Sequence, residues 1–312
     1  MRILVTDGMD KTAMAQLREA GHEVVEQFYE PDQLGAALRE FDAVVVRSKT
    51  KVRANHIDEA KGGKLKLIIR GGVGVDNIDV KYAEANGITV KNTPKASSQS
   101  VAELAMGHMF SCARYLSIAG HTMREGKWEK KSYGKGIELQ GKTLGIVGFG
   151  RIGQSTGRIA KALGMRVLAY DVFPTDAGRA VGEYVDLDTL LAASDVIALH
   201  CNLTPENEKI ICKANIDKMK DGVILVNNAR GQLVAEQDLA DALNSGKLAA
   251  AGLDVVYTEP IRPDNPLLTA KNCIITPHIS WAPKESRQRI MDATAENIRA
   301  FLAGTPQNVV NH

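Results

Sequence analysis

The sequence has few of the features that mark extracellular and metal-dependent proteins. Its 312 residues include only four cysteines, which are widely separated and form no Cys-x-x-Cys pair. Thiols spaced in this way are typical of free cysteines in a reducing compartment, and their spacing does not match that of a zinc site. We therefore expect no disulfide framework and no metal site.

Long apolar runs and a strong charge imbalance are also missing. No stretch approaches the ~20 apolar residues that a membrane helix needs. The N-terminal residues are typical of a first strand rather than of a signal peptide. The net charge is only +2, and the basic residues are scattered rather than gathered into a stripe. We therefore expect a cytoplasmic protein that binds neither membranes nor nucleic acid.

What the sequence does have is the composition of a globular α/β protein. Hydrophobic residues make up 44% of the chain and charged residues 24%, and the length is sufficient for two domains. Short apolar runs alternate with segments of helical periodicity, which favours parallel sheets covered by helices on both faces. The strands expected in the first third are Ile3–Thr6, Glu23–Val25, Ala43–Val46, Leu65–Ile69 and Thr89–Lys91. The helices expected there are Ala13–Ala20, Gln33–Leu38 and Val80–Ala85.

A glycine-rich turn near the middle of the chain carries the strongest functional signal. Gly148, Gly150 and Gly153 form a Gly-x-Gly-x-x-Gly pattern between an apolar strand and a helix, and Asp171 ends the next expected strand. This order is typical of dinucleotide binding: the glycines permit a tight turn, close approach of a pyrophosphate and close helix packing. The flanking segments are the strands Thr143–Val147 and Met165–Tyr170 and the helix Ile152–Leu163.

The identity of the dinucleotide follows from the acid and the helix start. Arg151 and Ile152 open the helix, whose free N–H groups and positive dipole end favour phosphates. Asp171 can accept hydrogen bonds from a ribose diol and would repel a 2′-phosphate. The sequence therefore predicts NAD rather than NADP as the cofactor.

Three polar side chains follow further expected strands, at the edge where open α/β sheets bind ligands. Arg230 comes after the strand near 223–226, Glu259 after the strand near Ala250, and His278 after Cys273–Ile275. A nicotinamide enzyme needs a proton donor and acceptor, a cation for a substrate carboxylate, and a group that fixes the state of the base. These three side chains match the three requirements.

Together the motifs resemble those of the D-isomer-specific 2-hydroxyacid dehydrogenases. The resemblance rests on Gly-x-Gly-x-x-Gly, Asn-x-x-Arg-Gly, Asp-Val-x-x-x-Glu-Pro and Pro-His, and it covers nearly the whole chain. It implies that Arg230 holds the substrate carboxylate, that His278 is the acid/base and that Glu259 orients the imidazole. It also implies cofactor contacts from three residues at other strand ends: Cys201, Ala229 and Asp254.

The family resemblance also suggests how the chain is divided and assembled. It implies two Rossmann-like, doubly wound parallel-sheet domains, with the nucleotide-binding domain inserted into a flavodoxin-like substrate domain. We expect a substrate-binding domain at 1–95 and 284–312 and an NAD-binding domain at 96–283, with a substrate cleft between them. A long small-residue helix expected over Val101–Met123 and the family resemblance both suggest a homodimer.

The substrate side is expected in the first domain. The loop Gly71–Asn77 follows a strand, and the resemblance implies that the N–H groups of Val73 and Gly74 bind the substrate carboxylate. Arg47 and Arg70 lie at the ends of two expected strands. If those strands are neighbours, two cations face one cleft, which suggests a second anionic group on the substrate, such as a phosphate.

Two local resemblances point to different acids. The segments around Arg47, Arg70 and Lys130 look like those of 3-phosphoglycerate dehydrogenases, in a short form without a C-terminal regulatory domain. The segment His278–Pro283, which contains Trp281, is more similar to glycerate dehydrogenases, also called hydroxypyruvate reductases. The charges of the two arginines favour oxidation of 3-phosphoglycerate to 3-phosphohydroxypyruvate, as in serine biosynthesis, with glycerate as the alternative. A non-catalytic NAD-sensing regulator is the alternative of another class.

Overall fold

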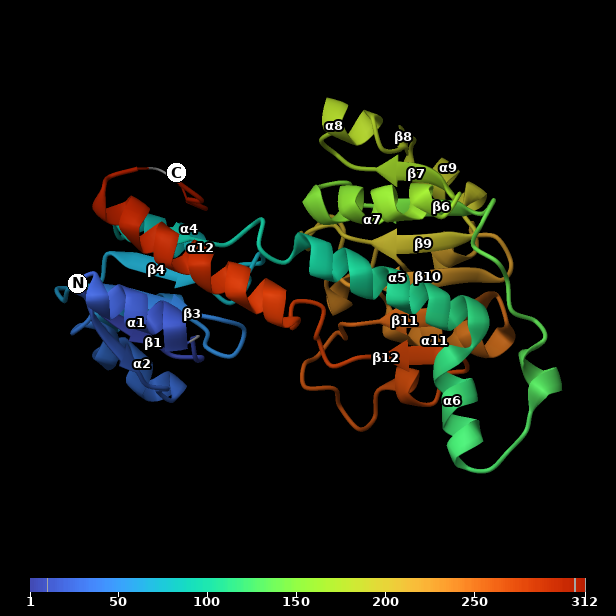
Figure 1. The fold of residues 1–312 in the computed structure, drawn as a ribbon, viewed down its shortest axis with the longest axis horizontal. Coiled ribbons are helices and arrows are strands. Elements are labelled where there is room, and N and C mark those ends of the chain that lie inside the picture. Colours follow the sequence, from blue (N-terminus) through green and yellow to red (C-terminus); the bar gives the residue numbers. More distant parts are fainter. Residues whose placement is uncertain (10, 306, 312) are drawn as a thin grey trace. The chain divides into compact units, whose positions relative to one another are not determined.

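The computed structural model describes residues 1–9, 11–305 and 307–311. The chain folds into two compact units (Figure 1). Unit 1 comprises Met1–Ser97 and Trp281–His312, and unit 2 comprises Ser98–Ser280. The middle of the chain thus forms one unit, whereas its two ends together form the other.

Unit 1 contains a five-stranded parallel sheet with the strand order β2-β1-β3-β4-β5. This is the flavodoxin-like order of a doubly wound sheet. The strands are β1 (Arg2–Val5), β2 (Glu23–Glu26), β3 (Ala43–Val46), β4 (Leu67–Arg70) and β5 (Thr89–Lys91). The helices are α1 (Lys11–Glu19), α2 (Pro31–Leu38), α3 (Ala54–Ala60), α4 (Val80–Ala85) and the C-terminal α12 (Lys284–Leu302).

Both faces of the unit 1 sheet are buried. Ile3 and Val5 of β1 belong to one hydrophobic cluster, whereas Leu4 between them belongs to another. Successive side chains of a strand point to opposite faces, so the two clusters lie on the two sides of the sheet. The first cluster includes residues of α1 and α12, which pack together although they come from opposite ends of the chain (Figure 1).

Unit 2 contains a seven-stranded parallel sheet with the order β12-β11-β10-β9-β6-β7-β8. Its strands are β6 (Thr143–Val147), β7 (Arg166–Tyr170), β8 (Glu183–Tyr184), β9 (Val196–Leu199), β10 (Val223–Asn227), β11 (Leu248–Leu253) and β12 (Cys273–Ile275). Its α-helices are α5 (Ser98–Arg114), α6 (Leu116–Arg124), α7 (Arg151–Ala162), α8 (Asp176–Arg179), α9 (Leu187–Ala193), α10 (Lys213–Ile216) and α11 (Glu236–Ser245). Its 3₁₀ turns are η1 (Lys130–Tyr133), η2 (Gly231–Leu233) and η3 (Pro266–Leu268).

The unit 2 sheet also separates two hydrophobic layers. Ile146 and Val147, neighbours in β6, belong to different clusters, one on each face. Helices α5 and α7 pack against each other, and α5 also contacts β10 and β11 (Figure 1). The predicted fold class, two doubly wound parallel-sheet units with one inserted into the other, is confirmed.

The prediction of one long helix over Val101–Met123 is wrong. The helix α5 ends at Arg114, and Tyr115 adopts a left-handed conformation with φ of 56° before α6 begins. The carbonyl of Ala113 accepts a hydrogen bond from the N–H of Ile137 at 3.0 Å, so a returning segment satisfies the end of α5. Sequence periodicity does not report this tertiary partner.

Other differences concern element bounds. The strand expected at Leu65–Ile69 is β4, Leu67–Arg70, so Arg70 is its last residue. The helices α3, α8, α9, α10 and α11 and the short strand β8 were not predicted. Among the described residues, no helix has the length and apolar character that crossing a bilayer would require.

Candidate active site

The turn after β6 has a backbone path that only glycine accommodates. Gly148 has a φ of +89°, and a Cβ atom there would lie 2.3 Å from the backbone nitrogen of Cys201. A Cβ on Gly153 would lie 2.3 Å from the carbonyl oxygen of Gly148. These two glycines therefore let β6, α7 and the segment after β9 approach one another closely.

Gly150, the residue that caps α7, is different. Its φ is −73°, and a Cβ atom there would meet nothing within 4 Å. The fold of the chain therefore does not require glycine at this position. An open backbone surface at a helix N-terminus is the feature that a bound pyrophosphate needs.

Asp171 follows β7 and is half-buried. Its carboxylate accepts hydrogen bonds from the N–H of Phe149 at 2.6 Å and from the N–H of Phe173 at 2.9 Å. The first bond ties the acid to the glycine turn, because β6 and β7 are paired neighbours. The acid is thus held beside the turn, and this arrangement fits an adenine dinucleotide.

Arg230 lies just beyond β10, in a loop organised by Asn227. The fully buried Asn227 side chain accepts a hydrogen bond from the N–H of Ala229 at 3.0 Å and donates one to the carbonyl of Arg230 at 2.9 Å. A Cβ atom on Gly231 would lie 2.0 Å from the carbonyl carbon of Val256. The Arg230 loop therefore packs directly on the segment that leads to Glu259.

Glu259 and His278 form a hydrogen-bonded pair. The distance between Nδ1 of His278 and Oε2 of Glu259 is 2.8 Å, and the two side chains are 34% and 40% exposed. Burial raises the pKa of Glu259, but the hydrogen bond and charge of His278, the N–H of Val256 and the charge of Arg230 together bring it below its ordinary value. Glu259 is therefore ionised at neutral pH and can orient the imidazole through Nδ1.

Asp254 is fully buried at the end of β11. Its carboxylate accepts hydrogen bonds from the hydroxyl of Thr276 at 2.6 Å and from the N–H groups of Ile279 at 2.9 Å and Ser280 at 2.8 Å. Its carbonyl accepts a further bond from the N–H of His278 at 2.9 Å. Asp254, expected as a cofactor contact, thus anchors the loop that carries His278.

Cys201 lies beside the glycine turn. Its backbone lies against Gly148, and burial raises the pKa of its thiol to about 11. The thiol is therefore protonated at neutral pH and is a poor nucleophile. Ala229, the other small residue expected near the cofactor, is buried in the Asn227 loop.

In unit 1, the strands that carry the two expected arginines are neighbours. The residues of β3 and β4 pair in parallel, with Val46 opposite Arg70, so Arg47 and Arg70 both lie at the carboxyl edge of the sheet. The guanidinium of Arg70 donates to the carbonyl of Gly71 at 2.6 Å. A side chain on Gly72 would collide with that guanidinium.

The loop after β4 presents backbone donors. Val73 and Gly74 are half-buried, and in the described part of the chain no hydrogen bond involves their N–H groups. The carbonyl of Val73 accepts a hydrogen bond from the amide of Asn92 at 2.7 Å, which fixes the loop. Two adjacent N–H groups on a fixed turn are suited to an anion.

Arg47 and Trp281 contact each other. The guanidinium lies 4.1 Å from the centre of the indole ring, and the N–H of Arg47 donates to Asp7 at 2.7 Å. Burial lowers the pKa of Arg47, the charge of Asp7 opposes this, and the charge of Arg287 adds to it. Sequence reasoning missed Asp7 and Arg287, because only the fold brings them to Arg47.

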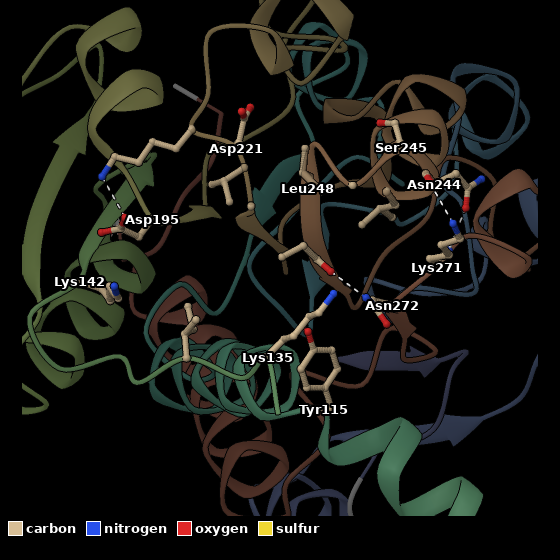
Figure 2. Close-up of a pocket in the computed structure, with 17 residues that line it drawn as sticks. Tyr115, Lys135, Lys142, Asp195, Asp221, Asn244, Ser245, Leu248, Lys271 and Asn272 are labelled. Atoms are coloured by element: carbon tan, nitrogen blue, oxygen red, sulfur yellow. Dashed lines mark hydrogen bonds and ion pairs between the residues drawn. The ribbon is translucent and has the colours of Figure 1, made fainter. Parts of the chain in front are cut away.

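A separate cavity of about 570 Å³ opens at the other edge of the unit 2 sheet (Figure 2). Its lining includes Tyr115, Lys142 and Asn272, together with Asp195, which accepts a hydrogen bond from Lys220 at 2.9 Å. The residues that begin β10 and β11 also line it. It contains none of the predicted site residues, all of which lie elsewhere in the two units.

The chain resembles proteins of known family over most of its length. Residues 106–280 match the NAD-binding domain of the D-isomer specific 2-hydroxyacid dehydrogenases. A hydroxypyruvate reductase of Blautia hydrogenotrophica is 56% identical over 245 residues (76% of each chain), and one of Thermotoga maritima is 47% identical over 300 residues (95% of this chain, 97% of the other). A D-3-phosphoglycerate dehydrogenase of Archaeoglobus fulgidus is 44% identical over all of this chain, which spans 59% of that relative.

Solved structures agree with these similarities. A D-lactate dehydrogenase from Aquifex aeolicus, in complex with NAD and lactic acid, is 30% identical with a TM-score of 0.87, covering 100% of this chain and 99% of the other. An NAD-dependent formate dehydrogenase from Staphylococcus aureus, in complex with NAD, is 28% identical with the same TM-score of 0.87 and the same coverage.

The doubly wound sheet, the glycine turn and the residues at the strand ends define the class of nicotinamide-dependent oxidoreductases. Within that class, the chain belongs to the family of D-isomer-specific 2-hydroxyacid dehydrogenases. It is an NAD-dependent enzyme that acts on the CH–OH group of a D-2-hydroxyacid.

Proposed function

We propose that Arg230, Glu259 and His278 carry out the reaction of this dehydrogenase. The observation that carries the proposal is the 2.8 Å pair of His278 and Glu259. His278 lies on the loop that Asp254 anchors, beyond β12. Arg230 follows β10, the strand that pairs with the other side of β11. The pair supplies a proton acceptor, and the guanidinium supplies a planar cation for a carboxylate.

The proposed roles follow from the chemistry of each group. Nδ1 of His278 faces Glu259, so Nε2 is the nitrogen that exchanges a proton with the substrate hydroxyl. Ionised Glu259 stabilises the imidazolium that forms during oxidation and holds the ring orientation. Arg230 binds the carboxylate and polarises the carbonyl during reduction.

The nucleotide side of the site is proposed to involve the glycine turn and its acid. When bound, NAD supplies the acceptor for the hydride. The open backbone at Gly150 and the first residues of α7, Arg151 and Ile152, receive its phosphates, and Asp171 receives the ribose diol. Cys201 and Ala229 line the approach, and Asp254 acts chiefly by holding the His278 loop.

The acid/base assignment is tested by His278→Ala. The expected result is a loss of about 10²–10⁴-fold in kcat, the usual contribution of a positioned acid/base, with the affinity for NADH retained. His22→Ala, a matched change beside the N-terminus of unit 1, serves as the control and keeps full activity. Full turnover by the His278→Ala protein would contradict the assignment.

For the substrate, we propose hydroxypyruvate, reduced to D-glycerate. This is supported by the two relatives of 56% and 47% identity, which are hydroxypyruvate reductases. It is also supported by the surroundings of Arg47, whose guanidinium is covered on one face by Trp281 and has the carboxylate of Asp7 nearby. That carboxylate offsets positive charge where a dianionic phosphate would need it.

The second candidate is 3-phosphoglycerate, the phosphorylated acid that the positive charges of the two arginines favour. Arg47 and Arg70 at neighbouring strand ends, with Arg287 close to Arg47, support it. A guanidinium stacked on an indole also keeps its in-plane N–H donors for an anion. The relative that supports this candidate is 44% identical.

A comparison of kcat/KM for hydroxypyruvate and 3-phosphohydroxypyruvate, each with NADH, separates the two candidates. We expect a preference of about tenfold or more for hydroxypyruvate, equivalent to about 1.4 kcal/mol. Arg70→Ala should leave that ratio unchanged, as should the control Lys64→Ala at an exposed position of unit 1. A preference for the phosphorylated acid that Arg70→Ala abolishes would instead establish the second candidate.

We further propose that unit 1 binds the substrate and unit 2 binds NAD. The match of residues 106–280 to an NAD-binding domain supports this for unit 2. The cluster of Arg47, Arg287 and the Val73–Gly74 turn supports it for unit 1.

A further inference from the structure

A cluster of buried polar side chains lies beneath the strand ends that carry the site. His108 of α5 is 3% exposed, Asn228 is 7% exposed and Asp254 is fully buried. Such groups are costly to bury unless hydrogen bonds replace water. His108 has no role in the proposed chemistry, so its burial at this position needs an explanation.

The sheet leaves space for this histidine. A Cβ atom on Gly252 of β11 would lie only 2.6 Å from the Cβ of His108. Gly252 therefore allows α5 to approach β11 closely, two residues before Asp254. The ring of His108 reaches Thr276, and its Nε2 lies 3.3 Å from the hydroxyl oxygen.

The hydrogen bonds of this cluster have a fixed direction. The hydroxyl of Thr276 donates to Oδ1 of Asp254 at 2.6 Å, and the two oxygens of this carboxylate also accept the backbone N–H groups of Ile279 and Ser280. Thr276 must therefore give its single proton to Asp254 and can only accept from His108. His108 consequently carries a proton on Nε2.

The other end of the network is the loop of the acid/base. The Asp254 carboxylate accepts the N–H groups of Ile279 and Ser280, and the Asp254 carbonyl accepts the N–H of His278. His278 itself has a φ of 52°, an uncommon conformation for a residue other than glycine. The hydrogen bonds of Asp254 to the N–H groups of His278 and of the two residues after it hold this backbone conformation in place.

The remaining nitrogen of His108 faces an apolar and amide environment. Burial lowers the pKa of His108, and the charge of Asp254 and the amide of Asn228 offset this only in part. Nδ1 of His108 lies beside the buried amide of Asn228, but among the described residues the two groups do not meet the geometry of a hydrogen bond. The histidine is thus neutral at physiological pH and donates only from Nε2.

We propose that His108 is a positioning residue whose Nε2–H orders Thr276 and, through it, the Asp254 carboxylate that holds the 276–280 loop under His278. The proposal rests on the role given to His278 in the proposed function. It makes α5, which has no residue in the predicted site, part of the support for the acid/base pair.

The kinetic test compares His108→Leu with His108→Gln. Leucine removes the donor at similar volume, whereas the amide nitrogen of glutamine can still donate to Thr276. With NADH and the better of hydroxypyruvate and 3-phosphohydroxypyruvate, we expect His108→Leu to lose about 10–100-fold in kcat, as for a small misplacement of a reacting group. The KM for NADH should be unchanged, and His108→Gln should restore kcat to within about threefold of wild type.

Hydrogen–deuterium exchange tests the same role without any turnover. The amides of Ile279 and Ser280 should exchange at least about tenfold faster in His108→Leu and in Thr276→Val, but not in His108→Gln or Thr276→Ser. If His108→Leu fails to fold, the comparison of Thr276→Val with Thr276→Ser still tests the same hydrogen bond. A wild type inactive on both oxo acids would refute the proposed substrates and leave this exchange test intact.

Two results would overturn the positioning role. One is a His108→Leu protein with wild-type kcat and wild-type exchange in the loop. The other is a His108→Gln protein as impaired as His108→Leu, which would mean that the ring acts through its shape and not through its donor.

Discussion

Gly150 and Gly148 have different physical requirements although they belong to one motif. A Cβ atom on Gly148 would strike the Cys201 backbone at 2.3 Å in a left-handed conformation, whereas one on Gly150 would meet nothing within 4 Å. The first glycine is therefore needed by the chain itself, and the second is left for a ligand. The motif in the sequence does not separate these two roles.

Gly150→Ala tests the role of the second glycine. We expect this variant to fold with an unchanged thermal midpoint but to bind NADH at least about tenfold more weakly, because the new methyl group occupies the approach to the pyrophosphate. Titration of NADH fluorescence measures the affinity. Gly107→Ala, in an open position of helix α5, is the matched control and should keep normal affinity. Unchanged affinity in Gly150→Ala would argue against the proposed phosphate position.

At the scale of elements, His200 links β9 to helix α7. Its Nε2 lies 3.1 Å from the hydroxyl of Thr156, and burial lowers the pKa of His200 from 6.5 to about 4. Between pH 6.5 and about 4, His200 is therefore protonated in the unfolded chain but neutral in the folded protein. The stabilisation is complete above pH 6.5 and is lost as the pH falls toward 4.

This linkage predicts a measurable acid sensitivity. Between pH 6.5 and 4, His200 should account for a loss of roughly 3 kcal/mol in the free energy of unfolding, at about 1.4 kcal/mol per pKa unit. Urea unfolding at a series of pH values measures it. In His200→Asn, which does not titrate, the fall over this window should be smaller by that amount. An equally steep fall in the variant would show that other groups are responsible.

At the scale of the whole molecule, helices α5 and α6 expose large apolar side chains. Phe110, Leu116 and Ile118 are 40%, 58% and 44% exposed, and Trp128 after α6 is 79% exposed. Figure 1 shows α6 projecting from the body of unit 2. An apolar surface of this kind is typical of a subunit interface, and the homodimer predicted from the sequence would use it.

The molecular prediction is that the enzyme has twice the mass of one chain in solution, measured by light scattering after size exclusion. The double change Leu116→Lys and Ile118→Lys should yield the monomer, because it places charge in the apolar surface. Leu268→Lys, at a residue that is 50% exposed in η3, should leave the dimer intact. A wild-type monomer would contradict the prediction.

The fold class and the family follow from the sequence alone. Both depend on local order along the chain: strand, glycine turn, helix and acid, and polar residues placed directly after apolar strands. Arg230, Glu259 and His278 could be named because parallel strands bring their carboxyl ends to one edge. The long helix was mispredicted because its end at Arg114 depends on a carbonyl satisfied by Ile137, a distant residue.

The surroundings of those residues depend on how distant parts of the chain pack together. The contact of Arg47 with Trp281, the burial of Asp254 under the His278 loop and the reach of His108 to Thr276 join residues 22 to 234 positions apart. No sequence period encodes such pairs, since they depend on how helices and strands pack. The sequence therefore identified the chemistry, and packing decided how its groups are held.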